Sequence, residues 1–428
     1  MLLEARGIDA VPVEERHGHA HDLFFLWFAA NLGFPAWYIG VLAVILGLSE
    51  PWGLAAVALG TVIGSVLVAG AAALGPATGR GSLPQSGRAF GRWGVRVPAL
   101  FTGVSCLGWL AVNTVLGTDA LASLFGWPPL LALAVLIIVQ VGLTVFGYDM
   151  IHRIERLASI VLLILFGWMA IRTLRAPVHA GLIPLHVPMA ILTVAIAASY
   201  VFSWGPYAAD YSRYLPRDTS RRAVFGWTLL GSAASTLGVM ALGVLMALRF
   251  HVTDPMALLG AATGHLRAIA YLAVVFGTLT ANVLNIYTGA TSTLTLGVSL
   301  NRVQAIILVG LLGFPLTWSG LRGFSGQYEN FLLLISYWVS PWLAVLFFDA
   351  MHPGDDRQDV GWGLFAFLVG VLASVPFMSQ TLWTGWVARA WGGADIAYYV
   401  GFVVAFGAMW IRERLRPAGT RTVRSLSA

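Results

Sequence analysis

The stretch SWGP at residues 203–206 interrupts an apolar segment that extends over residues 188–207. A second stretch, NLGFP at residues 31–35, interrupts another apolar segment, 23–48, near its middle. Glycine and proline weaken or end a helix because glycine adds backbone freedom and proline lacks the N–H donor. We therefore expect helix breaks in both segments, at Gly33, Pro35, Gly205 and Pro206.

The composition around these breaks is that of a membrane protein. Of 428 residues, 58% are hydrophobic and only 10% are charged, whereas a soluble domain carries roughly 25% charged residues. Cys106 is the single cysteine, which excludes an intrachain disulfide and a cysteine-based metal site. The polar residues 1–22 do not form a cleavable signal, because the apolar run that follows is too long. We expect them to be a cytoplasmic tail.

A search with a window of ~20 residues predicts twelve transmembrane segments. Each must be helical, since lipid offers no partner to unpaired backbone groups. The predicted segments are 23–48, 53–76, 97–121, 129–148, 157–172, 188–207, 224–248, 266–288, 303–319, 326–350, 361–382 and 392–411.

The basic residues, all of them arginine, predict the orientation. With the N-terminus inside, 19 arginines fall in cytoplasmic segments and 6 in external ones. Cytoplasmic loops are enriched in basic residues. We therefore expect a multi-pass protein of the cytoplasmic membrane with both termini in the cytoplasm.

The two breaks fall in the first and the sixth segments, and each begins a block of five. Five is an odd number, so the second block is inverted relative to the first. Matched broken helices in inverted repeats form the binding sites of secondary transporters. The predicted division is a tail (1–22), a first repeat (23–187), an inverted second repeat (188–350), two additional helices (351–411) and a cytoplasmic tail (412–428).

Several motifs resemble those of the nucleobase:cation symporters, the family of cytosine, purine, allantoin and hydantoin permeases. The most specific is SWGPYAADYSRYLP at residues 203–216. The resemblance covers nearly the whole chain and implies a LeuT-like five-plus-five fold with two extra helices. It also implies alternating access driven by a Na⁺ or H⁺ gradient. Further matching landmarks are Gly75-Pro76, Gly79, Arg88, Phe90-Gly91, Gly108-Trp109, Asn113, Thr280-Ala281-Asn282, residues 328–332 and Asp349.

The resemblance implies that Trp109 stacks on the substrate and that Asn113 binds its edge. A flat heterocycle needs an aromatic face and a few hydrogen-bonding side chains in a dry pocket. Cys106, Trp109 and Asn113 share one helix face through their spacing. Cys106 is a further candidate contact, at a position where some members of the family have glutamine.

The sixth predicted segment (188–207, helix 6) and the eighth (266–288, helix 8) supply the other predicted contacts. Phe202 and Ser203 stand at the second break, but the family's second stacking aromatic aligns with Val201. Either Phe202 or Tyr200 takes that role, or the second face is merely aliphatic. On helix 8, Asn282 is predicted to bind the substrate edge. Asn285 is the alternative for that role, and an interhelical hydrogen bond is the alternative function of Asn282.

The resemblance also implies a cation site formed by the carbonyls of Ala30 and Phe34 and by Gly277 and Thr280 of helix 8. Phe34, at the break, is a candidate substrate contact as well. Ala281 stands where the family has a second hydroxyl, so Na⁺ and H⁺ both remain open as the coupling ion.

Two charged residues near the cytoplasmic end of helix 6, Asp210 and Arg213, are predicted to pair and to act as structural or gating anchors. Asp119 and Glu329, towards the external helix ends, are more readily explained as solvated residues than as proton-coupling groups.

Other classes of protein fit the sequence less well. An intramembrane enzyme needs clustered acids or histidines, and a channel needs a ring of like polar groups without paired helix breaks. We expect no organic cofactor, no nucleic-acid partner and no obligate protein partner, only a heterocyclic substrate, a coupling cation and the bilayer. The alternative substrates are hydantoin, allantoin or a thiamine-precursor pyrimidine.

Overall fold

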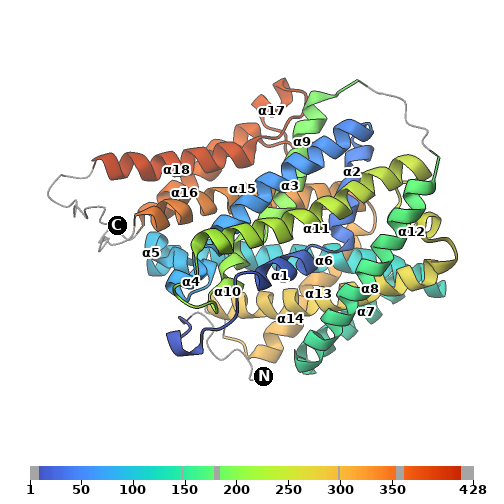
Figure 1. The fold of residues 1–428 in the computed structure, drawn as a ribbon, viewed down its shortest axis with the longest axis horizontal. Coiled ribbons are helices and arrows are strands. Elements are labelled where there is room, and N and C mark those ends of the chain that lie inside the picture. The colour runs from blue at the N-terminus through green and yellow to red at the C-terminus, as the bar shows by residue number, and fades with distance from the viewer. Residues whose placement is uncertain (1–8, 147, 178–183, 297–298, 353–360, 416–428) are drawn as a thin grey trace.

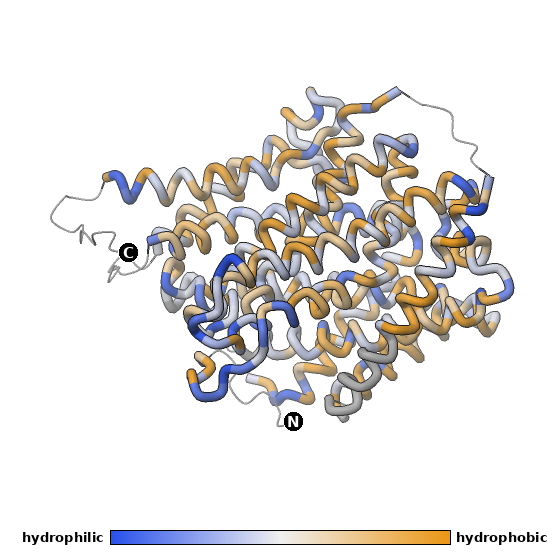
Figure 2. The backbone as a smooth tube through the Cα atoms, in the orientation of Figure 1, coloured by the Kyte–Doolittle hydropathy of each residue, from blue (hydrophilic) through white to orange (hydrophobic). Residues whose placement is uncertain are grey.

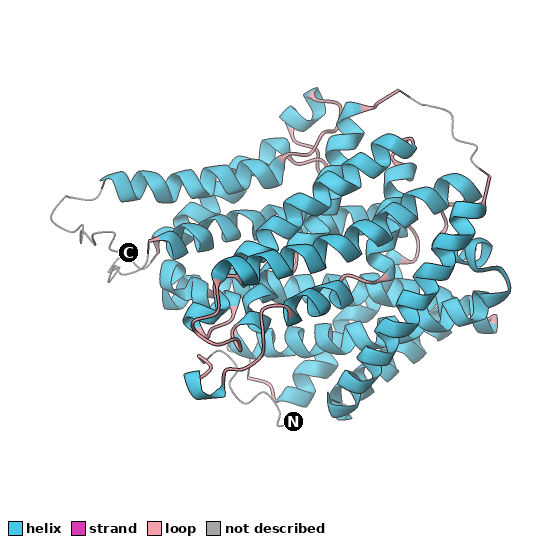
Figure 3. Ribbon diagram, viewed as in Figure 1, coloured by secondary structure: helices cyan, strands magenta, loops and turns pink. Residues whose placement is uncertain are grey.

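The computed structural model describes residues 9–146, 148–177, 184–296, 299–352 and 361–415. In these ranges the regular structure is helical, apart from an isolated bridge between Ser379 and Thr384 (Figures 1 and 3). The α-helices are α1 (Asp22–Ala30), α2 (Phe34–Ile45), α3 (Glu50–Ala72), α4 (Gly75–Thr78), α5 (Ser82–Gly94), α6 (Arg96–Phe125), α7 (Pro129–Phe146), α8 (Tyr148–Arg175), α9 (Val187–Phe202), α10 (Ala208–Ser212), α11 (Arg221–Phe250), α12 (Pro255–Thr263), α13 (Arg267–Thr295), α14 (Arg302–Gly320), α15 (Phe324–Met351), α16 (Trp362–Ser374), α17 (Trp386–Ala390) and α18 (Ala397–Leu415). Short 3-10 turns are η1 (Val13–Glu15), η2 (Gly205–Tyr207), η3 (Gly264–Leu266) and η4 (Val375–Phe377).

The structure confirms a helical, polytopic membrane protein. Within the described ranges, seven helical stretches are long and apolar enough to cross a membrane, and the bent pair α1 and α2 makes an eighth. Two shorter apolar helices, α7 and α16, occupy predicted segments too, as do α8 and α18. The predicted count of twelve is compatible with this arrangement. Apolar residues dominate the helices, and hydrophilic stretches gather at the ends of the bundle (Figure 2).

The first predicted break is a sharp one. Helices α1 and α2 meet at an angle of 58°. Asn31 ends α1 by donating from Nδ2 to the Trp27 carbonyl at 2.9 Å. Gly33 is extended, with φ −153° and ψ 161°, and α2 then begins at Phe34, with Pro35 in its first turn, where the missing N–H costs nothing. The chain therefore changes direction in the middle of the first span.

The second break is milder than the first. Helix α9 ends at Phe202, and the chain passes through η2 into α10, with Trp204 and Tyr207 still in the right-handed helical region. The Ser203 hydroxyl donates to the Tyr200 carbonyl at 2.6 Å, which satisfies one acceptor at the end of α9. The helix loosens here without the sharp bend seen between α1 and α2, since residues 187–212 still form one span.

The helix contacts occur in pairs that are consistent with the predicted repeats. Helix α3 packs against α9, and in the equivalent position of the second repeat α11 packs against α1 and α2. Helices α6 and α13, the third span of each repeat, form the most extensive contact, and α12 lies against α8 as α5 lies against α15. Helix α18 packs on α15 and α16 (Figure 1).

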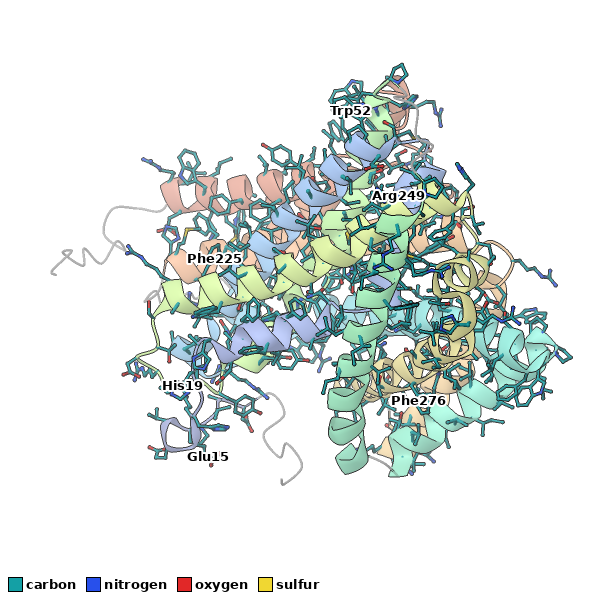
Figure 4. The ribbon with its side chains drawn as sticks, turned by 45° about the vertical axis from the view of Figure 1, so that its right-hand side comes forward. Glu15, His19, Trp52, Phe225, Arg249 and Phe276 are labelled. Carbon is teal, nitrogen blue, oxygen red and sulfur yellow. The ribbon has the colours of Figure 1, made fainter. Side chains whose placement is uncertain are left out.

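The N-terminal tail lies over the end of the bundle that holds α4 and α10. The backbone N–H of Val11 donates to Gly79 at 2.8 Å, and that of His17 donates to Tyr214 at 2.6 Å. The Arg16 guanidinium donates to the Pro76 carbonyl at 2.7 Å. In Figure 4, Glu15 and His19 mark this end, and Trp52 and Arg249 lie towards the other. Residues 1–8 and 416–428 of the predicted tails lie outside the described residues.

Glycines allow the close approach of α3 to α9. A Cβ on Gly60 would lie 2.6 Å from the Val194 carbonyl oxygen and 2.7 Å from the Ala197 Cβ. Membrane helices use such small residues because interhelical packing replaces the hydrophobic effect there.

We predict that Gly60→Ala destabilises the protein, by about 1–3 kcal/mol, through overpacking of the α3–α9 contact. Gly238→Ala on α11 is the matched control, because a Cβ there meets nothing within 4 Å. Both variants gain the same helix propensity. Thermal unfolding in detergent measures the difference, and equal midpoints for the two variants would contradict the packing account.

Candidate substrate site

Trp109 of α6 lies at the centre of an aromatic cluster. Its ring centroid is 5.2 Å from Phe331 and 6.3 Å from Tyr328, both on α15, and 5.7 Å from Tyr200 on α9. The rings meet at 84°, 69° and 80°, which is a favourable edge-to-face arrangement. Tyr200 and Tyr328 are buried, whereas Trp109 keeps part of its surface accessible. This placement agrees with a stacking role for Trp109, which stays a prediction.

Asn282 of α13 is the hub of a buried network of amides. Its Oδ1 accepts from Nδ2 of Asn113 and from Nδ2 of Asn285, each at 3.1 Å. Its Nδ2 donates to the Leu110 carbonyl at 3.1 Å and to the Thr114 hydroxyl at 2.9 Å. Two donated and two accepted bonds use the whole capacity of a side-chain amide. Asn282 is fully buried, so in this conformation it ties α13 to α6, and no bond is left over for a substrate.

The Leu110 carbonyl sets the direction of this network. A backbone carbonyl can only accept, so the atom of Asn282 that faces it must be the nitrogen. The oxygen of Asn282 then faces Asn113 and Asn285, which must both present their nitrogens to it. Asn113 and Asn285 each keep one N–H and one carbonyl oxygen that the hub does not use. The predicted alternative, Asn285, is therefore better placed than Asn282 to bind a further polar group.

The predicted face of α6 contacts both broken and unbroken helices. Cys106 is buried, with its sulfur 3.2 Å from the Tyr207 hydroxyl of η2. One turn further, Trp109 meets α9, and one turn beyond that Asn113 meets α13. The structure thus brings Cys106, Trp109, Asn113 and Asn282 to one side of α6.

Phe202 does not join this group. Its ring is fully buried and lies 6.0 Å from the ring of Tyr398 on α18. Tyr200, the alternative considered from the sequence, is the helix 6 aromatic that reaches Trp109. Val201 faces α3, where its side chain fills the space above Gly64. Because successive residues of a helix point about 100° apart, only one of the three can face Trp109.

Helix α15 covers one end of the site. The Tyr328 hydroxyl donates to the carbonyl of Pro35, directly after the first break, at 3.2 Å. Ser325 lies 2.7 Å from the Tyr38 hydroxyl of α2, and Phe324 stacks on Tyr328 at 5.5 Å. The two hydrogen bonds tie the first half of α15 to α2, and the contact of Phe331 with Trp109 ties it to α6.

The residues predicted for a cation belong to the first break and to α13. Phe34 is buried and its ring lies 5.3 Å from Phe166 of α8. Thr280 is partly accessible, and its hydroxyl donates within α13 to Phe276 or Gly277 at 3.2 and 3.1 Å. Helix α13 packs mainly on α6, α14, α7 and α8, whereas α1, which ends at Ala30, packs on α11. In the described residues no cluster of three His, Cys, Asp or Glu side chains could hold a metal ion.

Asp210 and Arg213, the predicted structural or gating anchors, contact different partners. Asp210 Oδ1 accepts from the backbone N–H of Ser82 at 3.1 Å, and the Ser82 hydroxyl accepts from the Ala209 N–H at 2.9 Å. The carboxylate therefore sits at the N-terminus of α5, where the helix dipole favours negative charge. Arg213 is buried beside its neighbour Tyr214, with Nη2 at 3.4 Å from the hydroxyl. The predicted pairing of Asp210 with Arg213 stays a prediction.

The structure also shows contacts that the sequence alone did not predict. Arg88 of α5 donates from Nε to the Asp349 carboxylate at the end of α15, at 2.7 Å. Thr114 and Gln140 extend the amide network behind Asn282. Gln140 had a detectable signal, since it is an amide in an otherwise apolar predicted span.

An apolar groove between α7 and α14 is separate from this site. It has a volume of about 400 Å³, and its lining residues include Ile137, Val141, Val303 and Ile307. A wholly aliphatic lining has no group that could bind the edge of a polar heterocycle.

Comparison with known proteins identifies the family. The profile of the family described as permeases for cytosine/purines, uracil, thiamine and allantoin matches residues 10–352. The chain belongs to this family. Its members are permeases rather than enzymes, and the predicted resemblance is confirmed.

Individual relatives agree with this assignment. YxlA of Bacillus subtilis, designated a purine-cytosine permease, is 31% identical, over 94% of each chain. The purine-cytosine permease fcyB of Emericella nidulans is 27% identical, over 94% of this chain and 87% of its own length.

Solved structures confirm the LeuT-like fold. The inward-facing conformation of Mhp1 matches with a TM-score of 0.78 at 16% identity, over 96% of this chain and 95% of that one. A closed conformation of Mhp1, a nucleobase-cation-symport-1 family transporter, with bromovinylhydantoin bound matches with a TM-score of 0.74 at 16% identity, over 97% and 96% of the two chains.

We predict that Tyr200→Ala raises the apparent KM for uptake about tenfold or more, because it removes the ring that supports Trp109. Phe202→Leu should leave the KM within about twofold of the wild-type value, since Phe202 packs on α18. Initial-rate uptake in proteoliposomes measures both. A larger effect from Phe202→Leu than from Tyr200→Ala would contradict this assignment of the two rings.

Proposed function

We propose that the chain imports a nucleobase of the cytosine or purine type by cation symport with alternating access. The observation that supports this most strongly is that Trp109 lies one helical turn from Asn113 on α6, and that Asn113 and Asn285 both donate to Asn282. A partly accessible indole and two amides with unused hydrogen-bonding groups suit a flat ring with donors and acceptors on its edge.

The amides suit the edge of a nucleobase in particular. Asn113 and Asn285 each have one N–H and one carbonyl oxygen outside the hub. An asparagine with one unused N–H and an unused carbonyl oxygen can bind a base through two hydrogen bonds. Its N–H donates to a ring nitrogen and its oxygen accepts from an exocyclic amino group, as with adenine in nucleic-acid recognition. The same donor and acceptor pattern occurs on cytosine.

The coupling ion is Na⁺ or H⁺ in this proposal. The Thr280 hydroxyl oxygen keeps accepting capacity, because its hydrogen is used within α13. Na⁺ prefers several oxygen ligands, and Ala281 offers no side-chain oxygen. A Na⁺ site would therefore rely on backbone carbonyls such as those of Ala30 and Phe34.

Alternating access would use the cover formed by α15. The contacts of Tyr328 with Pro35 and of Ser325 with Tyr38 close the predicted external side. Each is a single hydrogen bond at a helix end, which can break as the site opens outwards. In this proposal both termini are cytoplasmic and the protein resides in the cytoplasmic membrane, as the arginine distribution favours.

A related heterocycle is the alternative substrate. Val201 replaces an aromatic residue expected from the family, and Val201 is buried against α3. A hydantoin, allantoin or a thiamine-precursor pyrimidine presents a smaller stacking face than a purine and fits a site with fewer aromatic walls.

We predict saturable uptake of cytosine or a purine by the reconstituted protein, driven by an inward Na⁺ gradient or by a pH gradient alone. Labelled cytosine, adenine, hypoxanthine and uracil are compared with hydantoin, allantoin and a hydroxymethylpyrimidine in proteoliposomes. Uptake confined to the last three would establish the alternative substrate, and uptake of none would contradict both.

We predict that Trp109→Ala lowers uptake by raising the apparent KM roughly tenfold or more, because stacking on an aromatic side chain contributes about 1–3 kcal/mol per base. Trp52→Ala is the matched control, since Trp52 is a half-exposed tryptophan in the first turn of α3. Unchanged kinetics in Trp109→Ala would refute the stacking role.

A further inference from the structure

Gln140 is an unusual residue for its position in α7. The helix is apolar along its length except for Gln140 and Thr144, and Gln140 is fully buried. Its Oε1 lies 3.2 Å from the Thr114 hydroxyl of α6, and its Nε2 has no hydrogen-bond partner within the described ranges. A polar group inside a membrane protein is costly, and it is retained where it serves a purpose.

The role of Gln140 follows from the number of hydrogen-bond donors around the Leu110 carbonyl. A carbonyl oxygen has two lone pairs. Three donors point at this one. The N–H of Thr114 is required by the helix, the Thr114 hydroxyl lies at 2.6 Å, and Nδ2 of Asn282 lies at 3.1 Å. One of these three donors must therefore share a lone pair or bond to another acceptor. Asn282 Nδ2 is the donor held most weakly, because it comes from a different helix.

Gln140 supplies the missing acceptor. When the Thr114 hydroxyl donates to Gln140 Oε1, the Leu110 carbonyl keeps both lone pairs for the Thr114 N–H and Asn282 Nδ2. The second hydrogen of Asn282 Nδ2 then reaches the Thr114 oxygen, 2.9 Å away. With this arrangement each donor that surrounds Leu110 has its own acceptor.

We propose that Gln140 is a positioning residue for substrate recognition, although it does not itself touch the substrate. By accepting a hydrogen bond from the Thr114 hydroxyl, it holds Asn282 on the Leu110 carbonyl. Asn282 in turn holds the nitrogens of Asn113 and Asn285, and so decides which atoms these two residues offer to a ligand. The inference rests on the proposed function for the ligand, but the linkage between Gln140, Thr114 and Asn282 does not.

Loss of the acceptor has a defined consequence. Without Gln140 Oε1, the Thr114 hydroxyl competes with Asn282 for Leu110, and the Asn282 amide gains freedom to rotate. Asn113 and Asn285 then lose a fixed orientation, which weakens ligand binding while the helices remain packed. The expected effect is on the KM rather than on the maximal rate.

The experiment compares four variants in proteoliposomes, with cytosine and hypoxanthine as probes. Gln140→Met keeps the length and removes the acceptor, and we expect the KM to rise about five- to tenfold, as for the loss of one buried hydrogen bond. Gln140→Glu keeps an acceptor oxygen at the same place and should restore a KM within about twofold of the wild-type value. Gln140→Asn withdraws the amide by one methylene and replaces Gln140→Met if that variant does not fold.

Thr144→Val is the matched control. Thr144 lies one turn from Gln140 on α7 and is equally buried, but its hydroxyl donates to the Gln140 backbone carbonyl within the same helix. A purely structural role of polar groups in α7 would give Thr144→Val and Gln140→Met similar effects. The inference requires an unchanged KM in Thr144→Val.

Three results would overturn the inference: an unchanged KM in Gln140→Met, a KM in Gln140→Glu as high as in Gln140→Met, or a raised KM in Thr144→Val. If the wild-type protein takes up neither probe, the proposed function fails instead. The linkage is then measured without ligand by a double-mutant cycle of Gln140→Met and Thr114→Val on thermal unfolding. Non-additive effects support it, and additive effects overturn it.

Discussion

The hydrogen bond from Asn282 to the Leu110 carbonyl is the interaction on which the candidate site depends. It crosses between α13 and α6, the third helices of the two repeats, where the structure has its most extensive helix contact. A buried amide has two distinct ends, and leaving either end without a hydrogen-bond partner costs about 1–3 kcal/mol. Because the carbonyl can only accept, this single bond determines which end of each surrounding amide, the nitrogen or the oxygen, faces its neighbour.

The rest of the site is arranged around α6. Cys106, Trp109 and Asn113 follow one another along a single face of this helix, and each meets a different structural element. The first break lets α2 turn away from α1, and the carbonyl of Pro35, directly after it, accepts from Tyr328 of α15. The broken helix and the covering helix thus meet beside Trp109.

Much of the fold could be predicted from the sequence. Long apolar segments can only be helices in lipid, and the Gly-Pro pairs mark where two of them loosen. The sequence did not distinguish the sharp 58° bend at Gly33 from the gentler turn at Gly205, because both contain the same two residue types. That difference depends on how the neighbouring helices hold the backbone.

The site was predicted less completely than the fold. The sequence does not show how each helix is rotated about its axis, or which side-chain amides have all their hydrogen bonds used within the protein. Tyr200 and Phe202 are equally plausible in sequence, and only the rotation of α9 decides that Tyr200 faces Trp109. Asn282 was predicted to bind substrate, but four bonds to α6 and α13 use its amide in this conformation. Such saturation depends on contacts between residues far apart in the chain.

The most direct test of this account is a structure of the wild-type protein with a bound nucleobase, determined by electron cryomicroscopy at a resolution that places side-chain amides. The account predicts that Asn113 and Asn285 lie within hydrogen-bond distance of the base edge, that the base stacks on Trp109, and that Asn282 still contacts the Leu110 carbonyl. An Asn282 side chain turned away from Leu110 and bonded to the base would contradict it.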